Sequence, residues 1–357
     1  MIKKTSIYIS IICLFLMISC NKEDNSQNEN FDIVKYHEFY TDNLILPYLS
    51  NLVTNTTKLN EAISNFAITR NETNLTSLRD AWKEVAISFS KTQIGNLGNI
   101  QMSAVYLSIY SWDANEIKIE EFIASSTPIS ENEIITLPAK ARGLSAIEYL
   151  IFENDAASTI NSFSNQRRKD FLLSLGENVV SKINSLDNQW KSYSNSFINN
   201  TSTGINGSIN FIVNQMNFLL ENVRRFKVGE PAGMENSSIV DVTLLQADKS
   251  EISLEMIKEN IASIKTAYYG SAEGLDDYVR SISKNEDVNE AIANTFSAIE
   301  NNIASLSNSS LKNAITNNNS QVTALHKNIK DLIILIKVDV ASILSITVTF
   351  TDNDGDS

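Results

Sequence analysis

The sequence has few of the residues that break helices or that build metal and nucleophilic sites. Its 357 residues include 11 glycines, 4 prolines, 2 cysteines and 2 histidines. So little glycine and proline favours long helices over a loop-rich all-β fold. The two histidines, His37 and His326, are isolated, and neither belongs to an H-E-x-x-H or similar pattern of zinc ligands. An isolated histidine on a helix is more often a structural residue than a ligand.

Both cysteines lie in or next to the N-terminal leader. Lys3 and Lys4 precede a short apolar run, and together they predict a signal peptide over residues 1–19. The segment Met17-Ile18-Ser19-Cys20 resembles a bacterial lipobox, with Cys20 as the lipidated first residue of the mature chain. The alternatives are an ordinary signal peptide with a chance cysteine and a membrane anchor, for which the apolar run is short. Cleavage would leave no cysteine for a disulfide, a metal site or a nucleophile.

The chain is acidic, which bears on its partners. The formal net charge is −13, and loss of residues 1–19 would remove two lysines and take it to −15. A field of this sign repels nucleic acid and anionic lipid headgroups. We therefore expect no nucleic-acid partner, and contact with the membrane through the lipid at Cys20. The expected location is the bacterial outer membrane, facing the periplasm or the cell surface.

Residues 20–30 are polar and low in complexity, which predicts a flexible tether. Lys22-Glu23-Asp24 within it resembles the charged export tag of some Bacteroidetes surface lipoproteins. A merely solvated tether is the other interpretation of the same three residues.

The first half of the remaining chain predicts a series of helices. Residues 31–69 fit one or two helices that Pro47 interrupts or begins, and residues 78–89 fit the next. The glycine-dense run 95–100 predicts a loop. Shorter helical pieces are expected at Val105–Ile109, Trp112-Asp113 and Ile117–Ile123, and Pro138 is expected to begin the helix that follows.

The second half is more regular. Apolar residues recur at three- and four-residue steps through residues 172–197, 209–226, 257–268, 288–306 and 322–343. Long amphipathic helices joined by short polar loops are typical of an antiparallel bundle, so the predicted fold is all-α. A domain boundary is expected near Asn154 to Asn165, which divides the chain into an N-terminal helical domain (31–157) and a C-terminal one (158–346). Residues 347–357 read as an acidic tail.

One short segment, Arg142 to Glu153, combines an apolar helical face with an embedded carboxylate. Glu148 adjoins the face formed by Ile147 and Leu150 and lies three residues after Ser145, on the same helix surface. A carboxylate so close to a core must find a partner, shift its pKa or reach a solvated cleft. Glu148 is therefore the first candidate for a functional residue.

Three other motifs are weaker. Gly143-Leu144-Ser145 begins like the G-x-S-x-G of serine hydrolases, but Ile147 replaces the second glycine and no strand precedes it. The run 352–356 begins like a calcium loop but lacks the glutamate and the following helix, so a solvated tail is expected. In the segment 227–233, Gly and Pro predict a helix end, and the loop would return toward the other domain.

Several segments together resemble the imelysin-like family, also called peptidase family M75, bacterial envelope proteins related to iron-regulated protein A. They are LILPYLSNLVTNTTKLNEAISNF, LRDAWKEV, SIYSWDANEIKIEEFI, RGLSAIEYLIFE, FKVGEPAG and DVASILSITVTFTDNDGD. The resemblance implies two helical domains built around four-helix bundles, with a functional cleft between them. The family signature is G-x-H-x-x-E. Gly143 and Glu148 match it, and Ser145 stands at the histidine position.

The serine changes what the resemblance implies about chemistry. Iron or zinc is the cofactor that the family implies, but a serine hydroxyl is a poor ligand for either compared with imidazole. We therefore predict a non-enzymatic binding or accessory lipoprotein, with iron acquisition as the role that the resemblance suggests. The predicted ligand site comprises Glu148, Ser145, Gly143, Arg142 and Lys227, with no catalytic residue and no metal ligand.

Two alternatives stay open at this stage. A metal-dependent peptidase of the imelysin type would have to recruit His37 or His326 to the cleft. Alternatively, Glu148 has a purely structural role, bonded to a neighbouring helix such as one that bears Arg142 or Lys227.

Overall fold

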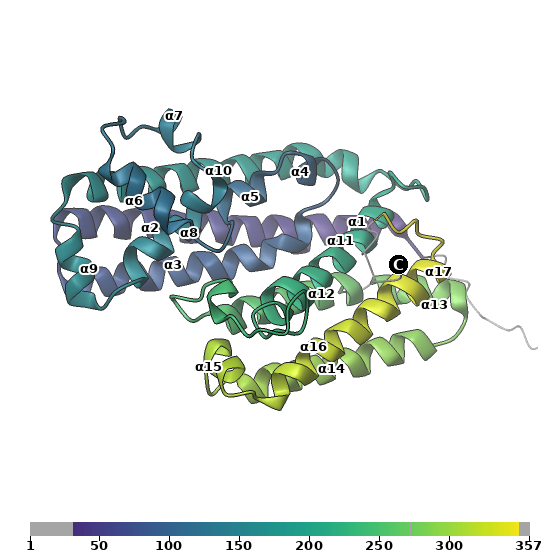
Figure 1. The fold of residues 1–357 in the computed structure, drawn as a ribbon. Helices are drawn as coiled ribbons and strands as arrows, with labels where there is room; N and C mark the ends of the chain where they lie inside the picture. Colours follow the sequence, from purple (N-terminus) through teal and green to yellow (C-terminus); the bar gives the residue numbers. More distant parts are fainter. Residues whose placement is uncertain (1–30, 272, 350–357) are drawn as a thin grey trace, which may run out of the picture. The chain divides into compact units, whose positions relative to one another are not determined.

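The computed structural model describes residues 31–271 and 273–349, which contain helices, turns and no β-strand (Figure 1). The all-α prediction is therefore confirmed for this part of the chain. The predicted signal peptide, Cys20, the tether and most of the acidic tail lie outside the described residues. Within the described residues, no helix is both long enough and apolar enough to cross a membrane.

Three long helices from both halves of the sequence pack side by side. They are α2 (Leu46–Ile68), α3 (Glu72–Thr92) and α10 (Gln166–Ile198), and α2 contacts both of the others along its length (Figure 1). Before α2, the helix α1 (Ile33–Glu38) continues through the π-helical turn η1 (Phe39–Ile45). Pro47 lies in the first turn of α2, where its missing N–H needs no intrahelical partner.

A second set of helices comes from the C-terminal half. It consists of α11 (Ser208–Asn222) with the π-helical turn η4 (Val223–Gly229), α12 (Ser253–Tyr269), α14 (Asp287–Leu306) and α16 (Ser320–Ile334) with η6 (Leu335–Val340) and α17 (Ala341–Ile343). In this set α14 packs on α16, and α12 packs on α14. Because α12 also packs on α3, it joins the second set to the first.

Shorter elements connect the long ones. Between α3 and α10 they are η2 (Gln93–Gly95), α4 (Gly98–Met102), α5 (Val105–Ile109), α6 (Glu116–Ala124), α7 (Glu131–Ile134), η3 (Ala139–Ala141), α8 (Gly143–Phe152) and α9 (Ala156–Ser162). Later in the chain they are η5 (Val242–Leu244), α13 (Leu275–Ser283) and α15 (Leu311–Thr316).

The long predicted helices are confirmed, and the errors fall in the short connections. Trp112-Asp113 was expected to be helical but lies in a bend, and the expected loop at 95–100 contains the start of α4. Pro138 begins only the short turn η3, and the helix with Glu148 begins at Gly143. These segments are too short for apolar periodicity to decide their structure.

The predicted division into two domains at residues 157 and 158 stays a prediction. The helix α9 occupies the expected boundary segment. The helix α10, which follows that boundary, packs on α2 and α8, which precede it. The N-terminal helix group is thus completed by a helix from the second half of the chain.

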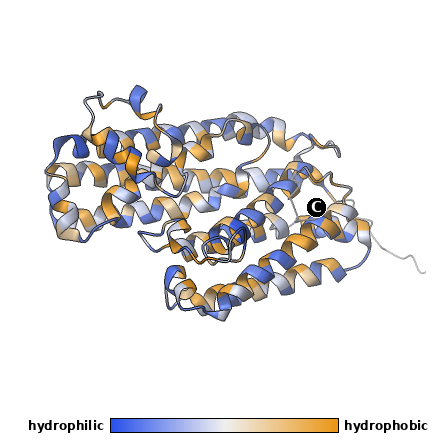
Figure 2. Ribbon diagram, viewed as in Figure 1, coloured by the Kyte–Doolittle hydropathy of each residue, from blue (hydrophilic) through white to orange (hydrophobic). Residues whose placement is uncertain are grey.

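Burial follows the apolar stripes. Figure 2 shows hydrophobic and hydrophilic residues interleaved along the long helices, as expected for helices with one buried face. Trp82 on α3 and Trp190 on α10 are fully buried, and each indole N–H donates to a backbone carbonyl, of Leu144 and of Gly95 respectively, at 3.0 Å. Both tryptophans are therefore buried without an unsatisfied donor.

Candidate functional site

The helix α8 begins in unusually close contact with the segment Ile109–Trp112. Gly143 has a φ of +65°, and a Cβ at this position would collide with the carbonyl oxygen of Ile109. Only glycine combines a positive φ with the absence of a side chain. The first glycine of the predicted signature is thus required by backbone geometry.

Ser145 also binds this segment. Its hydroxyl donates to the backbone carbonyl of Ser111, and the residue is buried. On the neighbouring turn, the carbonyl of Leu144 accepts the hydrogen bond from Trp82. The Ser145 hydroxyl therefore satisfies a backbone carbonyl, and its proton is not available to a ligand in this arrangement.

Glu148 is the centre of the site. It is 5% exposed, and its Oε1 accepts hydrogen bonds from the backbone N–H of Ser250 at 3.0 Å and from the Ser250 hydroxyl at 2.8 Å. Its Oε2 accepts a hydrogen bond from the Tyr110 hydroxyl at 3.2 Å. Glu148 thus joins α8 to Tyr110, at the C-terminal end of α5, and to a turn about one hundred residues later in the chain.

Burial and a nearby charge decide how Glu148 titrates. Removal of the carboxylate from water raises the pKa of Glu148 to about 7, and the negative charge of Asp248 acts in the same direction. The hydrogen bonds from Ser250 and Tyr110 lower the pKa but do not offset the burial. Near neutral pH the side chain is therefore present in both protonation states.

Lys227 packs against the ring of Trp112 and bonds to two amide side chains. Its ammonium is 5.6 Å from the centre of the Trp112 ring and donates to Gln93 Oε1 at 3.0 Å and to Asn260 Oδ1 at 2.6 Å. Burial lowers the pKa of Lys227 to about 7. Because the residue is 1% exposed, it is placed to hold η4 against η2 and α12.

Arg142 is directed elsewhere. Its guanidinium donates to the carbonyl of Ile135 at 2.7 Å, and within the described residues no hydrogen bond or ion pair links it to Glu148. The structure thus brings Gly143, Ser145 and Glu148 together on one segment, whereas Lys227 and Arg142 bond to other residues.

The sequence analysis missed the partners of Glu148. Tyr110 and the turn Asp248–Ser250 carry no motif, and only the need of a buried carboxylate for donors pointed to their existence. Lys249 in this turn pairs with Glu116 at 2.8 Å and with Glu153, so the turn is also held by charge. Glu148 is hydrogen-bonded within the fold, but its partners are Ser250 and Tyr110 rather than Arg142 or Lys227, and the purely structural role stays a prediction.

The residues around Glu148 do not fit the metal that the resemblance implies. Within the described residues, no group of three or more His, Cys, Asp or Glu side chains could hold a metal ion. The oxygen atoms of Glu148 and Ser145 are already engaged in hydrogen bonds. His326 Nε2 is 2.7 Å from Glu235 Oε1, and His37 Nδ1 is 3.0 Å from the Ile198 carbonyl, so both imidazoles have other partners.

A polar hollow of about 750 Å³ adjoins this site on the far side of Ser250. It is lined by Thr76, Arg79, Asp80 and Lys83 of α3, by Phe152, by Lys249–Ile252, by Glu255 of α12 and by Ser307–Ser310. Glu148 is not among its lining residues. It accepts hydrogen bonds from Ser250, which does line the hollow.

The role of Gly143 can be tested by stability. We expect Gly143→Ala to lower the free energy of unfolding by about 2–4 kcal/mol, because the positive φ and the overlap with the Ile109 carbonyl both oppose a Cβ. Urea unfolding followed by circular dichroism measures the change. Gly204→Ala is the control, since its Cβ would have only the Ser202 hydroxyl oxygen nearby, at 3.8 Å. Equal losses in both variants would contradict this account.

The raised pKa of Glu148 predicts a pH dependence of stability. The folded state binds this proton more tightly than the unfolded state, so the contribution of Glu148 is complete below pH 4.5 and is lost as the pH rises through about 7. We expect the wild type to lose on the order of 3 kcal/mol from this group over that interval.

The measurement is urea unfolding between pH 4.5 and 8 for the wild type and for Glu148→Gln, which cannot titrate. The difference between the two free energies of unfolding should change with pH in the stated direction. Glu61→Gln, on the exposed face of α2, controls for the change of a carboxylate to an amide. Parallel profiles for the wild type and Glu148→Gln would show that the group does not titrate there.

Comparison with known proteins identifies the family and agrees with the all-α fold. The family model described as Imelysin, peptidase M75, matches residues 45–336. The crystal structure of a candidate iron-regulated protein A precursor from Parabacteroides distasonis ATCC 8503 aligns with a TM-score of 0.74 at 19% identity, over 87% of this chain and 95% of that one. An imelysin-like protein from Psychrobacter arcticum 273-4 aligns with a TM-score of 0.73 at 15% identity, over 89% and 97%.

No curated protein matches the chain. At these identities the two crystal structures support the fold alone, whereas the family model covers most of the sequence, including the segments that carry Gly143, Glu148 and Lys227. The chain belongs to the imelysin family.

Proposed function

We propose that this protein is a non-catalytic binding protein of the bacterial cell envelope, anchored by a lipid at Cys20. Its ligand is a small charged molecule, and its binding site is the polar hollow between α3, the turn 249–252 and the connection between α14 and α15. The signature carboxylate Glu148 is a positioning residue that fixes the floor of that site.

The observation that carries this proposal is the complete use of the signature side chains within the fold. Glu148 accepts three hydrogen bonds, from Ser250 and Tyr110, and the Ser145 hydroxyl is bound to the Ser111 carbonyl. A general base or a metal ligand needs an electron pair directed at the substrate or the ion. Glu148 and Ser145 instead bond to other groups of the protein. Through Ser250, Glu148 fixes the edge of a hollow.

The lining of the hollow supports a charged ligand. Lys83 and Arg79 face it from α3, and Asp80, Glu251 and Glu255 also line it. A site with both positive and negative side chains suits a zwitterionic ligand, or a carboxylate ligand that also binds a cation. The guanidinium of Arg79 is fixed by the carbonyls of Ile151 at 2.7 Å and Asn154 at 2.9 Å, so part of the site is preorganised.

The proposed link to iron rests on the name of one similar structure. The Parabacteroides distasonis structure carries the name of an iron-regulated protein A precursor. We propose by analogy that the ligand of this chain is connected with iron uptake, delivered for example as an iron chelate of a small carboxylic acid.

A panel of small charged ligands tests the binding site. Ferric citrate, citrate, and acidic, basic and zwitterionic amino acids are added to the purified full chain, and the melting temperature is measured. We expect at least one member to raise the melting temperature of the wild type by several degrees, because a ligand at 100 times its Kd adds about 2.7 kcal/mol.

The variant for this test is Lys83→Ala, which removes a cation from the hollow, and it should reduce the shift. Lys58→Ala, on the exposed face of α2, is the matched control and should retain it. The binding proposal is contradicted if no ligand stabilises the wild type, or if Lys83→Ala responds as fully as the control.

The peptidase alternative has its own test. We expect the full chain to release no peptides from casein above the buffer blank, with or without added zinc or iron, because His326 bonds to Glu235 and His37 to the Ile198 carbonyl. Elemental analysis should find neither metal in stoichiometric amount. Zinc- or iron-dependent hydrolysis in the wild type that disappears in Glu148→Gln would overturn the non-catalytic proposal.

A further inference from the structure

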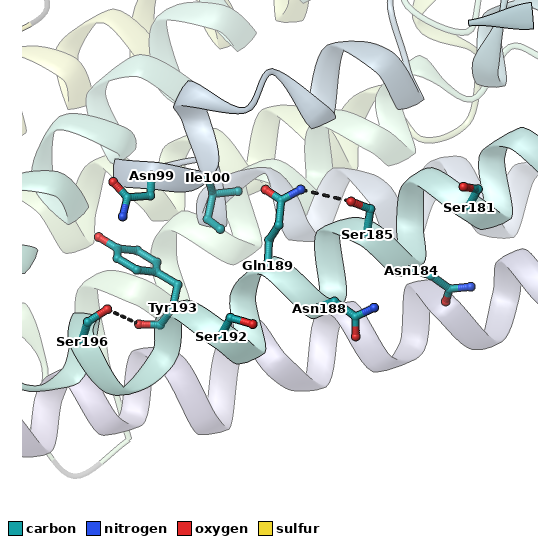
Figure 3. Close-up of a pocket in the computed structure, with 10 residues that line it drawn as sticks. All are labelled: Asn99, Ile100, Ser181, Asn184, Ser185, Asn188, Gln189, Ser192, Tyr193 and Ser196. Carbon is teal, nitrogen blue, oxygen red and sulfur yellow. Dashed lines mark hydrogen bonds between the residues drawn. The ribbon is translucent and has the colours of Figure 1, made fainter. Parts of the chain in front are cut away.

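A second surface of the molecule, unrelated to the signature helix, has the character of a binding groove. A hollow of about 820 Å³ runs along the outer face of α10, and Figure 3 shows the side chains that line it. From α10 they are mostly amides and hydroxyls, with the ring of Tyr193 toward one end. Asn99 and Ile100 of α4 form the facing side.

The groove continues into a second hollow of about 420 Å³ that shares Asn99 with the first. The second hollow lies between α4 and α11 and contributes Phe211 and Phe218, together with Gln215. We call the two joined hollows the neutral groove.

The neutral groove contains no charged residue. None of the residues that line either hollow is Asp, Glu, Lys or Arg, although one residue in five of the whole chain is charged. Charged residues are normally most frequent on the surface, so their absence over so large an area is a specific feature of the groove. A carboxylate borders the groove, since the Ser181 hydroxyl lies 3.5 Å from Glu131 Oε1. The lining offers no cation to an acidic ligand, which disfavours acidic partners.

The groups that are present match a polyhydroxylated ligand. An amide side chain offers a donor and an acceptor side by side, and a serine hydroxyl can do either. Adjacent hydroxyl groups on a sugar ring present the same mixture of donors and acceptors. The flat C–H face of a sugar ring packs on an aromatic ring such as those of Tyr193 or Phe211, which combine apolar area with rigidity.

Several of these groups are held in position before any ligand binds. The Tyr193 ring packs on Trp190 and Phe197, with ring centres 5.7 Å apart in each case. Gly98, with a φ of +52°, leaves room for the Tyr193 hydroxyl, which would be 2.6 Å from a Cβ there. Gln189 Nε2 donates to the Ser185 hydroxyl at 3.1 Å, a bond drawn in Figure 3. Such preorganisation lowers the entropic cost of binding.

Gln215 adds a buried polar group at the inner end of the groove. It is 4% exposed and its Nε2 donates to the carbonyl of Gln93 at 2.7 Å. Its Oε1 accepts no hydrogen bond from the described residues, and the residue lines the second hollow. A fixed acceptor without a partner beside an open hollow is suited to a hydroxyl of a ligand.

We propose that the neutral groove binds an uncharged oligosaccharide. The lining residues of α10 extend from Ser181 to Ser196, which spans about 22 Å along the helix. A groove of this length suits a chain of several sugar units better than a single ring. The site is separate from the charged hollow near Ser250, so the two proposals stand or fall independently.

Isothermal titration calorimetry with the purified full chain tests the proposal. The neutral probes are maltohexaose, cellohexaose, xylohexaose and mannohexaose, and the acidic probe is the hexamer of galacturonic acid. We expect at least one neutral probe to bind and the acidic probe to give no heat.

The variant is the double substitution Asn188→Ala with Gln189→Ala, which removes two amides from the groove. It should weaken binding about tenfold, the effect of about 1.4 kcal/mol. Asn195→Ala, an exposed amide on α10 outside the groove, is the matched control and should bind as the wild type does. Ser192→Lys, at an exposed position, provides a second variant that adds bulk and charge with little risk to folding, and it should also weaken binding.

Three outcomes would overturn the proposal. One is the absence of binding by all four neutral probes. The second is binding of the acidic hexamer alone. The third is binding of a neutral probe that neither the double variant nor Ser192→Lys weakens.

Discussion

The site depends on the contact between the first turns of α8 and the segment Ile109–Trp112. Gly143 allows the two backbones to approach, the Ser145 hydroxyl satisfies the carbonyl of Ser111, and Glu148 accepts a hydrogen bond from Tyr110. The three signature positions thus contact three consecutive residues of one segment. An irregular segment has backbone groups that no regular secondary structure pairs. The helix α8 can bind such a segment because a glycine, a short donor and a long acceptor lie along one of its surfaces.

Glu148 extends this contact to the C-terminal half of the chain. Its second oxygen binds both the N–H and the hydroxyl of Ser250, in the turn that leads into α12. That turn is held again by Lys249, which pairs with Glu116 and Glu153, and by Lys312, which donates to the Asp248 carbonyl at 3.2 Å. A buried carboxylate is costly unless its hydrogen bonds are satisfied, so it is sensitive to any displacement of its partners. This explains why the residue serves well to fix two distant segments.

The sequence was sufficient to predict the long helices and to single out Glu148 as an unusual carboxylate. It did not predict the partners of Glu148, which come from distant loops. The recurrence of apolar residues at three- and four-residue steps through residues 172–197 predicted α10. Over so long a segment, a few residues that break the pattern do not obscure it. The position of Glu148 beside an apolar face predicted that the carboxylate finds a partner, shifts its pKa or reaches a solvated cleft. The structure shows it buried, with Ser250 and Tyr110 as hydrogen-bond donors. Ser250 and Tyr110 could not be found, since a serine and a tyrosine in polar connections carry no periodic signal. Lys227 is fully buried, which its position in a glycine- and proline-containing segment did not indicate.

The serine at the signature position changes what the same backbone can do. An imidazole there would place a nitrogen ligand next to Glu148, and the two side chains could then share a metal. A hydroxyl is shorter, and it binds the nearest carbonyl instead. In this chain Glu148 accepts its hydrogen bonds from Ser250 and Tyr110. The two sites proposed for ligands, the charged hollow beyond Ser250 and the neutral groove along α10, differ in the charge of their lining and would therefore select different chemistry.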